Sequence, residues 1–351
     1  MFYDVIVVGG GPAGATFARL AGKFARILLI DGAPLRFGDK GKPCGGLLAP
    51  DAQKVLRKSG LSVPEDVLTE PQIDFVKTID CKSGIIRNYK RTYINVSRER
   101  FDRWLISLCD EVVTVACGIC VNIEKQGDAF YIEYRNGKGE VAAATCRYLV
   151  GADGAASVVR RFAFPGAKPR MYTSIQQWFR NNDSAPLYSC IFDESITDCC
   201  SWSISKGRYT VFGGAYPMDM PMERFENQKK VLRRFGYILE DPVRTECCLV
   251  LRPRAEKDFF LGEDGVFLIG EAAGFVSSSS LEGISYAIKS GEALANALAC
   301  KAPHKSYRLL TAKIRARLMM KTLKCPFMYY PPLRRFVMKS GIMSAKKDEN
   351  N

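Results

Sequence analysis

The sequence predicts a two-domain α/β protein, and three observations support this prediction. The first 33 residues have the order strand, glycine turn, helix and strand, as in a Rossmann-like nucleotide-binding unit. Residues 266–298 repeat the order strand, glycine turn and helix. Between about 170 and 260 the pattern changes to short alternating runs separated by turn residues, which is typical of an antiparallel sheet. Because these runs fall between the two glycine turns, we expect the two domains to be interleaved.

The amino-terminal unit, FYDVIVVGGGPAGATFARLAGKFARILLIDGAP, contains the spacing GxGxxG. Gly9 permits the tight turn, Gly11 lets the backbone approach a pyrophosphate, and Gly14 lets the helix pack against the strand. The helix begins at Ala13, and its positive N-terminal end would face the phosphates. Asp31 ends the second strand, where a carboxylate accepts hydrogen bonds from ribose hydroxyls. The unit predicts dinucleotide binding, but the spacing alone does not distinguish NAD from FAD.

Composition argues against several other classes of protein. The chain has 351 residues and one histidine, His304, which disfavours Ser–His or Cys–His catalysis and histidine-based metal sites. Its thirteen cysteines, with no recognisable secretion signal, predict reduced thiols in the cytoplasm. Cys117 and Cys120 form a lone CxxC motif, for which small side chains on a strand are a better explanation than zinc. We therefore expect no metal site.

Three later segments extend the nucleotide-binding pattern. YLVGADGAASVVRR at 148–161 centres on Asp153, and FLIGEAAG at 267–274 carries an acid, Glu271, after glycine. NVSRERFDRWLISL at 95–108 contains Arg98. Together with GxGxxG, these motifs in this order resemble the FAD-dependent oxidoreductases of the aromatic-hydroxylase type. The resemblance covers roughly residues 1–300 and implies a Rossmann-like domain that binds FAD.

The resemblance also implies roles for individual residues. Glu271 would hold the ribityl chain, although the family usually has the shorter aspartate there. Gly283 and Ile284 would begin a helix whose positive end lies beside the flavin ring. Arg98 would lie near the pyrophosphate, whereas by itself it is equally well explained as a solvated helix charge. The residues expected to bind FAD are Gly9, Gly11, Ala13, Gly14, Asp31, Cys44, Gly45, Gly46, Arg98, Asp153, Gly270, Glu271, Gly274, Gly283 and Ile284.

The loop KPCGGLLAP at 42–50 resembles the KxCGGGL loop of the geranylgeranyl reductase branch of this family. In that branch the loop lines the flavin ring and the cysteine faces the reacting centre. Gly45 and Gly46 would let the main chain lie against the ring without a Cβ collision, while Leu47 replaces the family's third glycine. Cys44 would then donate a proton; the alternative is a structural thiol that only lines the pocket.

The sheet region is expected to cover the flavin and to form the substrate side. Geranylgeranyl reductases carry a YxWxFP-like element in this sheet, and Trp202 matches its tryptophan, so we place Trp202 with Cys44 at the catalytic centre. Cys200, Ile204 and Ser205 depart from the element, which disfavours a geranylgeranyl substrate but not a hydrophobic one. Since the chain has no second GxGxxG motif, NAD(P)H would visit transiently or another protein would supply electrons.

The charge is concentrated at the C-terminal end. The formal net charge is +14, and residues 301–347 hold thirteen Lys or Arg with no Asp or Glu. A helix over 306–324 would carry Leu310, Ile314 and Leu318 on one stripe and basic residues on another, which suits the anionic inner face of a membrane. A helix packed on the FAD domain with a solvated basic face is the alternative. Nucleic acid is not expected, since no recognised binding module accompanies the charge.

These motifs define the predicted domains and functions. We assign 1–70, 96–168 and 258–300 to the FAD-binding domain, 71–95 and 169–257 to the antiparallel-sheet substrate domain, and 301–351 to a basic helical C-terminal segment. The favoured function is reduction of C=C bonds in an isoprenoid or other lipid-like substrate. The alternatives are a flavin monooxygenase acting on an aromatic or hydrophobic substrate, and a flavin-binding tolerance factor at the membrane surface.

Overall fold

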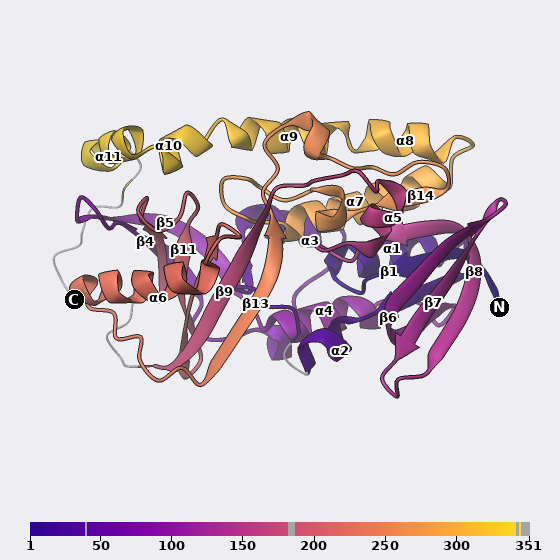
Figure 1. Ribbon diagram of the computed structural model, residues 1–351, viewed down its shortest axis with the longest axis horizontal. Helices are drawn as coiled ribbons and strands as arrows, with labels where there is room; N and C mark the ends of the chain where they lie inside the picture. Colours follow the sequence, from indigo (N-terminus) through magenta and orange to yellow (C-terminus); the bar gives the residue numbers. More distant parts are fainter. Residues whose placement is uncertain (39–40, 182–186, 342–343, 345–351) are drawn as a thin grey trace.

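The computed structural model describes residues 1–38, 41–181, 187–341 and 344, and it contains two β-sheets with helices around them (Figure 1). The strands of the first sheet are β1 (Phe2–Val8), β2 (Ile27–Asp31), β6 (Val113–Gln126), β7 (Ala129–Asn136), β8 (Val141–Gly151) and β14 (Val266–Leu268). β1 pairs in parallel with β2 and β8, and the sheet continues in parallel to β6 and β14. β7 pairs antiparallel with β6 and β8, so a hairpin meander joins the two sides of the parallel sheet.

The core of the first sheet forms because its central strands are apolar on both faces, as parallel strands covered by helices require. α1 (Pro12–Ala21) and α7 (Ile284–Leu298) pack together against this sheet. Gly291 permits their close approach, since a Cβ there would lie 2.5 Å from the carbonyl oxygen of Ala13. The other helices up to α7 are α2 (Ala33–Phe37), α3 (Pro50–Lys58), α4 (Arg98–Ser107), α5 (Val158–Ala163) and α6 (Pro221–Leu232).

The second sheet has eight strands in the order β13-β9-β12-β11-β10-β4-β5-β3. Their bounds are β3 (Leu47–Leu48), β4 (Ile73–Asp80), β5 (Ile85–Asn95), β9 (Met171–Arg180), β10 (Tyr188–Phe192), β11 (Ser201–Lys206), β12 (Tyr209–Tyr216) and β13 (Arg244–Leu251). The prediction of an antiparallel sheet needs one correction, because β10 and β4 pair in parallel. These two strands come from separate stretches of the chain, so no hairpin imposes an antiparallel register where they meet.

The chain alternates between the two sheets. β3, β4 and β5 of the second sheet follow β2 of the first, and β9 to β13 lie between β8 and β14. The predicted two-domain α/β fold is therefore confirmed.

The C-terminal helices lie in a row along one long edge of the molecule, drawn in yellow in Figure 1. They are α8 (Pro303–Leu310), α9 (Ala312–Thr322), α10 (Cys325–Tyr329) and α11 (Pro331–Ser340). The single helix predicted over 306–324 is wrong, because the chain bends at Thr311, whose hydroxyl donates to the carbonyl of Tyr307. Leu310 is consequently exposed, while Ile314 and Leu318 are buried. Residues 342–343 and 345–351 of the predicted segment lie outside the described residues.

A buried ion pair holds α11 against the second sheet. The guanidinium of Arg334 donates to Asp80 at 2.7 Å and to Glu194 at 2.6 Å. The side chains of Arg334 and Asp80 are 4% and 0% exposed, and Arg335 also pairs with Glu194. The guanidinium of Arg334 also lies over the ring of Phe192. α11 is thus a fixed part of the fold.

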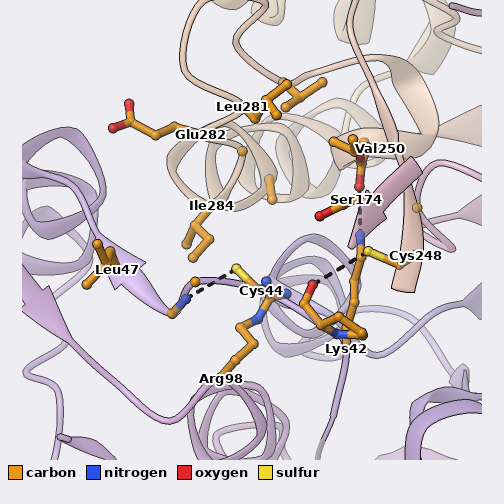
Figure 2. A pocket seen from close by; sticks show the side chains of 18 of the residues that line it. Lys42, Cys44, Leu47, Arg98, Ser174, Cys248, Val250, Leu281, Glu282 and Ile284 are labelled. Carbon is orange, nitrogen blue, oxygen red and sulfur yellow. Dashed lines mark hydrogen bonds and ion pairs between the residues drawn. The ribbon is translucent and has the colours of Figure 1, made fainter. Parts of the chain in front are cut away.

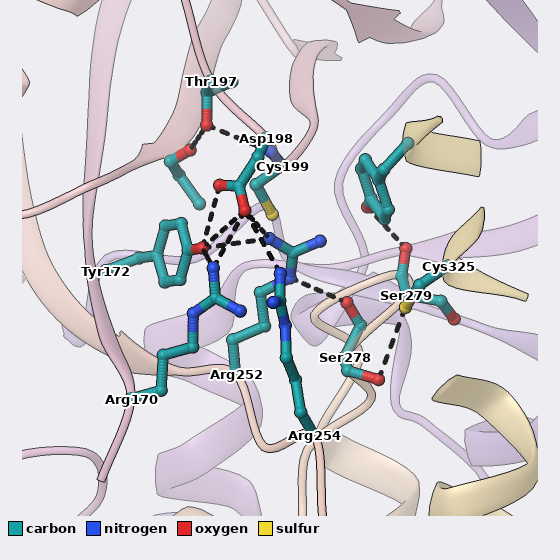
Figure 3. A network of polar contacts seen from close by, with 12 residues as sticks. Arg170, Tyr172, Thr197, Asp198, Cys199, Arg252, Arg254, Ser278, Ser279 and Cys325 are labelled. Carbon is teal, nitrogen blue, oxygen red and sulfur yellow. Dashed lines mark hydrogen bonds and ion pairs between the residues drawn. The ribbon is translucent and has the colours of Figure 1, made fainter. Parts of the chain in front are cut away.

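A second polar network ties the ends of β9 and β13 to α10 (Figure 3). Arg252, which is 1% exposed, lies 3.2 Å from Asp198 and donates to the carbonyl of Ser278 at 3.1 Å. Its guanidinium stacks over the ring of Tyr329 at 4.6 Å. Arg170 and Arg254 share the same carboxylate of Asp198. The network therefore carries three cations for one carboxylate.

Candidate functional site

One cavity of about 700 Å³ runs from the glycine turn of the first sheet to the C-terminal helices. It is lined by strands of both sheets, by the N-terminus of α7, and by Met328 and Met338 of α10 and α11. The predicted site residues on its wall are Gly9, Gly11, Ala13, Asp31, Cys44, Gly45, Gly46, Arg98, Asp153, Trp202, Glu271, Gly283 and Ile284. Gly14, Gly270 and Gly274 are not on the wall and act through packing: a Cβ on Gly14 would lie 1.9 Å from the carbonyl oxygen of Gly9.

The nucleotide end of the cavity has an open cradle at Gly11. A Cβ built on Gly11 meets no protein atom within 4 Å, although Gly11 lines the cavity and caps the N-terminus of α1. The backbone amides of this helix end point toward the open space, which suits a phosphate. Asp31 lies on the same wall at the end of β2, and its carboxylate accepts from the amide of Ala33 at 3.0 Å. A dinucleotide fits this arrangement.

Asp153 supplies a second sign of a ligand. One carboxylate oxygen accepts from the amides of Val158 and Val159 at the start of α5. The other oxygen is buried and has no hydrogen-bond partner among the described residues. Burial raises the pKa of this carboxyl, although hydrogen bonds from Ser157 and Val158 oppose the shift. A buried acceptor on the cavity wall is normally satisfied, so a donor from a bound molecule is expected there.

Cys44 lies on the cavity wall beside Arg98 of α4, and Ile284 of α7 lines the same cavity (Figure 2). Its sulfur accepts from the amide of Gly46 at 3.4 Å. Burial alone would raise the pKa of the Cys44 thiol, but Arg98 beside it and the Gly46 amide lower that pKa below its ordinary value. Cys44 is therefore a stronger acid than an ordinary thiol.

Arg98 is not a solvated helix charge. It begins α4, where Ser97 caps the helix by accepting from the amide of Arg100. The Nε of Arg98 donates to Asp102 at 2.9 Å, and the two side chains are only 13% and 15% exposed. The ion pair fixes the guanidinium next to Cys44, so the charge acts on the thiol.

Gly46 is required by the protein's own packing, and Gly45 lies close to a neighbouring side chain. A Cβ on Gly45 would lie 2.8 Å from Ile204, and one on Gly46 would lie 2.4 Å from the carbonyl oxygen of Val96. Gly46 also has a φ of +61°, which side chains disfavour. The loop therefore sits tightly on the second sheet, a reason for the glycines that is independent of a flavin ring.

Glu271 is held by a partner that sequence reasoning missed. One carboxylate oxygen lies 2.7 Å from the Nζ of Lys42, and the other accepts from the amide of Leu251 at 3.0 Å. Although burial would lower the pKa of Lys42, the charge of Glu271 raises it. Both oxygens have protein partners, so a ribityl hydroxyl would share the carboxylate with Lys42. In the sequence, the sign of this arrangement is the glutamate at position 271, where the family usually has the shorter aspartate.

Trp202 lines the cavity from β11 of the second sheet. Its indole nitrogen is buried without a hydrogen-bond partner among the described residues. Tyr93 and Tyr188, which also line the cavity, form an edge-to-face pair at 5.5 Å. The hydroxyl of Tyr93 lies 3.4 Å from Glu282. Aromatic side chains therefore line this end of the cavity, which suits a hydrophobic ligand.

Lys206 is a buried cation near Cys44 that the sequence did not indicate. It lies at the end of β11, is 6% exposed, and donates to the carbonyls of Val96 at 2.8 Å and Gly46 at 3.1 Å. Burial lowers the pKa of Lys206 to about 7, and the nearby Cys44 only partly opposes the shift. Lys206 thus holds the cysteine loop and is poised to lose its proton near neutral pH.

Replacing Lys206 with methionine is expected to flatten the pH dependence of stability above pH 7. Between its folded pKa of about 7 and the ordinary lysine value, the unfolded chain binds a proton that the folded chain does not. The free energy of unfolding of the natural chain therefore rises with pH over this range, by up to about 1.4 kcal/mol per pH unit from this group. Urea unfolding at pH 7, 8 and 9 measures the slope, with exposed Lys138→Met as control. An unchanged slope in Lys206→Met would contradict the assignment.

The described part of the chain shows neither a metal site nor a membrane-spanning helix. No group of three or more histidine, cysteine or acidic side chains is placed to hold a metal ion there. Cys117 is exposed on β6 while Cys120 is buried. No described helix combines the length and the apolar character needed to cross a bilayer.

Comparison with solved structures shows the fold that this cavity belongs to. The chain superposes on a geranylgeranyl bacteriochlorophyll reductase-like protein from Thermoplasma acidophilum with a TM-score of 0.69 and 20% identity, covering 99% of this chain and 89% of that one. PqsL, a probable FAD-dependent monooxygenase from Pseudomonas aeruginosa, gives 0.68 and 17% over 97% and 100% of the chains. The flavin-dependent brominase Bmp2 gives 0.65 and 21% over 97% and 93%. The predicted aromatic-hydroxylase type of fold is thereby confirmed.

Comparison with curated proteins shows the family. No family model matches the chain. The chain is 46% identical over 347 residues to Protein CbrA of Escherichia coli O6:H1, covering 97% of this chain and 94% of that protein. Protein CbrA of Shigella dysenteriae serotype 1 is also 46% identical, over 97% of both chains. The chain therefore belongs to the CbrA family, and it has the fold of FAD-dependent oxidoreductases.

Proposed function

We propose that this protein is an FAD-dependent oxidoreductase that reduces C=C bonds of an isoprenoid or other lipid-like substrate. The observation that carries the proposal is the continuous cavity, which has a phosphate cradle at Gly11, an orphaned acceptor at Asp153, the acidified Cys44 on its wall and an aromatic end at Trp202. When bound, FAD would supply the hydride for such a reduction.

The residues of the nucleotide end would bind and orient the cofactor. Gly11 and the N-terminus of α1 would hold the pyrophosphate, and Asp31 would accept from the ribose. Gly283 and Ile284 place the N-terminus of α7 on the cavity wall, where its dipole stabilises negative charge. Lys42 and Glu271 together would bind the polar chain between the two ends.

The residues of the substrate end would exclude water and supply a proton. Trp202, Tyr188 and Phe192 face the cavity from the second sheet, and Met328 and Met338 close it from α10 and α11. The Cys44 thiol would give its proton to the second carbon of the double bond, and a water molecule would reprotonate the sulfur. The substrate would thus gain two hydrogens, with electrons supplied by transient NAD(P)H or by a donor protein.

A second candidate is a monooxygenase that hydroxylates an aromatic or hydrophobic substrate. It is supported by the likeness to PqsL and Bmp2, which are described as a probable FAD-dependent monooxygenase and a flavin-dependent brominase. The cysteine-bearing loop beside Ile204 and Lys206 supports the reductase, because its thiol lines the cavity and could donate a proton.

An anaerobic reaction separates the two functions. The chemically reduced holoprotein is mixed with polyprenyl lipids without oxygen, and flavin absorbance and lipid mass are followed. The reductase predicts flavin reoxidation with a mass gain of two hydrogens. Reoxidation only on admitting oxygen, with a gain of one oxygen atom, would contradict it. Cys44→Ala should slow the reaction by roughly a hundredfold or more, as expected for loss of a general acid, whereas Cys248→Ala on the same wall should not.

A further inference from the structure

We infer that the row of helices α8 to α11 docks on an anionic lipid bilayer and that the substrate end of the cavity opens onto this surface. The inference deepens the proposed function, since it rests on a lipid-like substrate and states from where that substrate enters.

The outer side of these helices exposes large apolar side chains that the protein leaves uncovered. Leu323, Phe336 and Leu309 are 71%, 69% and 67% exposed. The exposed apolar residues of the row are Leu309, Leu310, Met320, Leu323, Phe327, Tyr330 and Phe336. The inner side is buried normally, because Tyr307, Ile314 and Leu318 join the core of the first sheet. An apolar surface of this extent on otherwise well-packed helices marks an interaction site.

The charge of the row identifies the partner. Residues 301–341 contain no Asp or Glu. The exposed cations are Lys301, Lys305, Arg308, Lys313, Arg317, Lys324 and Lys339. Within the described part of the chain Arg317 pairs with Asp51, and the other six lie in no ion pair. A surface with apolar and cationic side chains and no acids matches an anionic bilayer, which has anionic headgroups at its surface and an apolar core beneath them.

α9 shows that the two kinds of side chain share one face. Lys313 and Met320 of α9 are exposed together with Leu323 and Lys324, which follow the end of α9. Because the backbone stays helical at Leu323 and Lys324, the spacings bring all four side chains to the same side. Ile314 and Leu318 lie on the opposite, buried side. Met320 and Leu323 could therefore enter the bilayer while the lysines reach its headgroups.

The cavity reaches the molecular surface at the same row. Phe327 of α10 lines the cavity and is also 54% exposed, so it stands at an opening. Across from α11, Lys90 and Arg91 of β5 line the cavity and are exposed. α11 packs against β5. The opening thus has an aromatic side chain and two cations at its rim, and a lipid could pass through it without crossing water.

The polar network behind α10 adds positive charge next to this surface. Arg170, Arg252 and Arg254 share the single carboxylate of Asp198, and Arg252 stacks on Tyr329 of α10 (Figure 3). Arg170 and Arg254 are partly exposed, so the network contributes to the long-range positive field of the protein, which attracts it to an anionic surface.

Vesicle co-sedimentation tests the docking with the purified full-length protein. We expect binding to vesicles of phosphatidylcholine with 30% phosphatidylglycerol at low salt, and little binding to phosphatidylcholine alone. Lys313→Ala/Lys324→Ala/Lys339→Ala should weaken binding at least tenfold, since one lysine near such a surface contributes about fivefold. Met320→Ser/Leu323→Ser/Phe336→Ser should weaken it comparably. The matched controls Lys23→Ala/Lys138→Ala/Lys230→Ala and Met222→Ser/Ile238→Ser/Val243→Ser should bind as the natural chain does.

Brominated phospholipids, which quench nearby tryptophan fluorescence, show which side of the protein enters the bilayer. Fluorescence of Leu323→Trp should be quenched on docking, whereas that of Ile238→Trp should not. Equal vesicle binding by all variants would overturn the inference. It would also be overturned if the protein bound no vesicles but associated with itself, and the apolar triple substitution abolished that self-association. A protein that docks but reduces no lipid would contradict the proposed function alone. A protein that reduces a lipid without binding vesicles would contradict the docking alone.

Discussion

Replacing Gly11 with valine is expected to weaken FAD binding strongly while leaving the fold intact. Gly11 has φ −68° and ψ −177°, which any residue adopts, and no protein atom lies within 4 Å of a Cβ built there. The valine side chain would therefore occupy only the space that the pyrophosphate needs. We expect FAD affinity to fall by roughly a hundredfold or more, equivalent to about 2.8 kcal/mol. Fluorescence titration of the apoprotein measures the affinity, and thermal unfolding measures the stability.

Gly14→Val is the matched control for this experiment. A Cβ on Gly14 would lie 1.9 Å from the carbonyl oxygen of Gly9, so the turn itself has to move. We expect a loss of about 3 kcal/mol or more, or no soluble protein. If Gly11→Val destabilised the apoprotein as much as Gly14→Val does, or if it still bound FAD normally, the cradle at Gly11 would not be a phosphate site.

Removing Arg334 is expected to be the most damaging change in the C-terminal helices. Arg334→Leu leaves the fully buried Asp80 without its main cationic partner, although Arg335 remains 3.6 Å away. Loss of one partner of a buried ion pair costs about 3–5 kcal/mol. α11 should then detach and open the apolar end of the cavity at Met338. Urea unfolding measures the stability, and protease cleavage within 331–340 reports the detachment.

The exposed ion pair of Arg317 with Asp51 provides the control. Because the Arg317 side chain is 52% exposed, Arg317→Leu should cost at most about 1 kcal/mol.

The pH dependence of stability gives a second test of the Arg334–Asp80 pair. Burial would raise the pKa of Asp80, but hydrogen bonds from Ser83 and Arg334 lower it below the ordinary carboxyl value. The ionised Asp80 therefore stabilises the folded state fully above the ordinary carboxyl pKa. This stabilisation is lost as the pH falls through the lower pKa that Asp80 has in the folded state. Arg334→Leu should lose less stability between pH 5 and 3 than the natural chain; an equal loss would contradict the role of this pair.

The parts of the site that the sequence predicted are those in which a short stretch of chain contains its own partners. The turn at Gly9 and Gly11 and the cap at Gly283 are each set by local backbone geometry. Such features depend on residue type and spacing, so pattern alone is sufficient to find them.

The parts that were missed depend on contacts between distant stretches of chain. Lys42 and Glu271 are 229 residues apart, and Lys206 meets Gly46 across 160 residues. The parallel pairing of β10 with β4 likewise joins two separate segments. A lysine at the end of a strand looks solvated in the sequence, and only the packed fold shows that Lys206 is buried. The closing of the cavity by α10 and α11 was missed because a basic segment with exposed aromatics gives no sign of which side faces inward.

The measurement that tests the central claim most directly is the flavin content of the natural chain. Protein purified without added cofactor, then supplied with FAD and freed of excess, should carry one FAD per chain, released on denaturation and counted by absorbance. Its bound flavin should shift the thermal midpoint upward, as a ligand of the folded state must. A folded protein with an unchanged midpoint and no retained FAD, under conditions in which a known flavoprotein is fully loaded, would contradict the account.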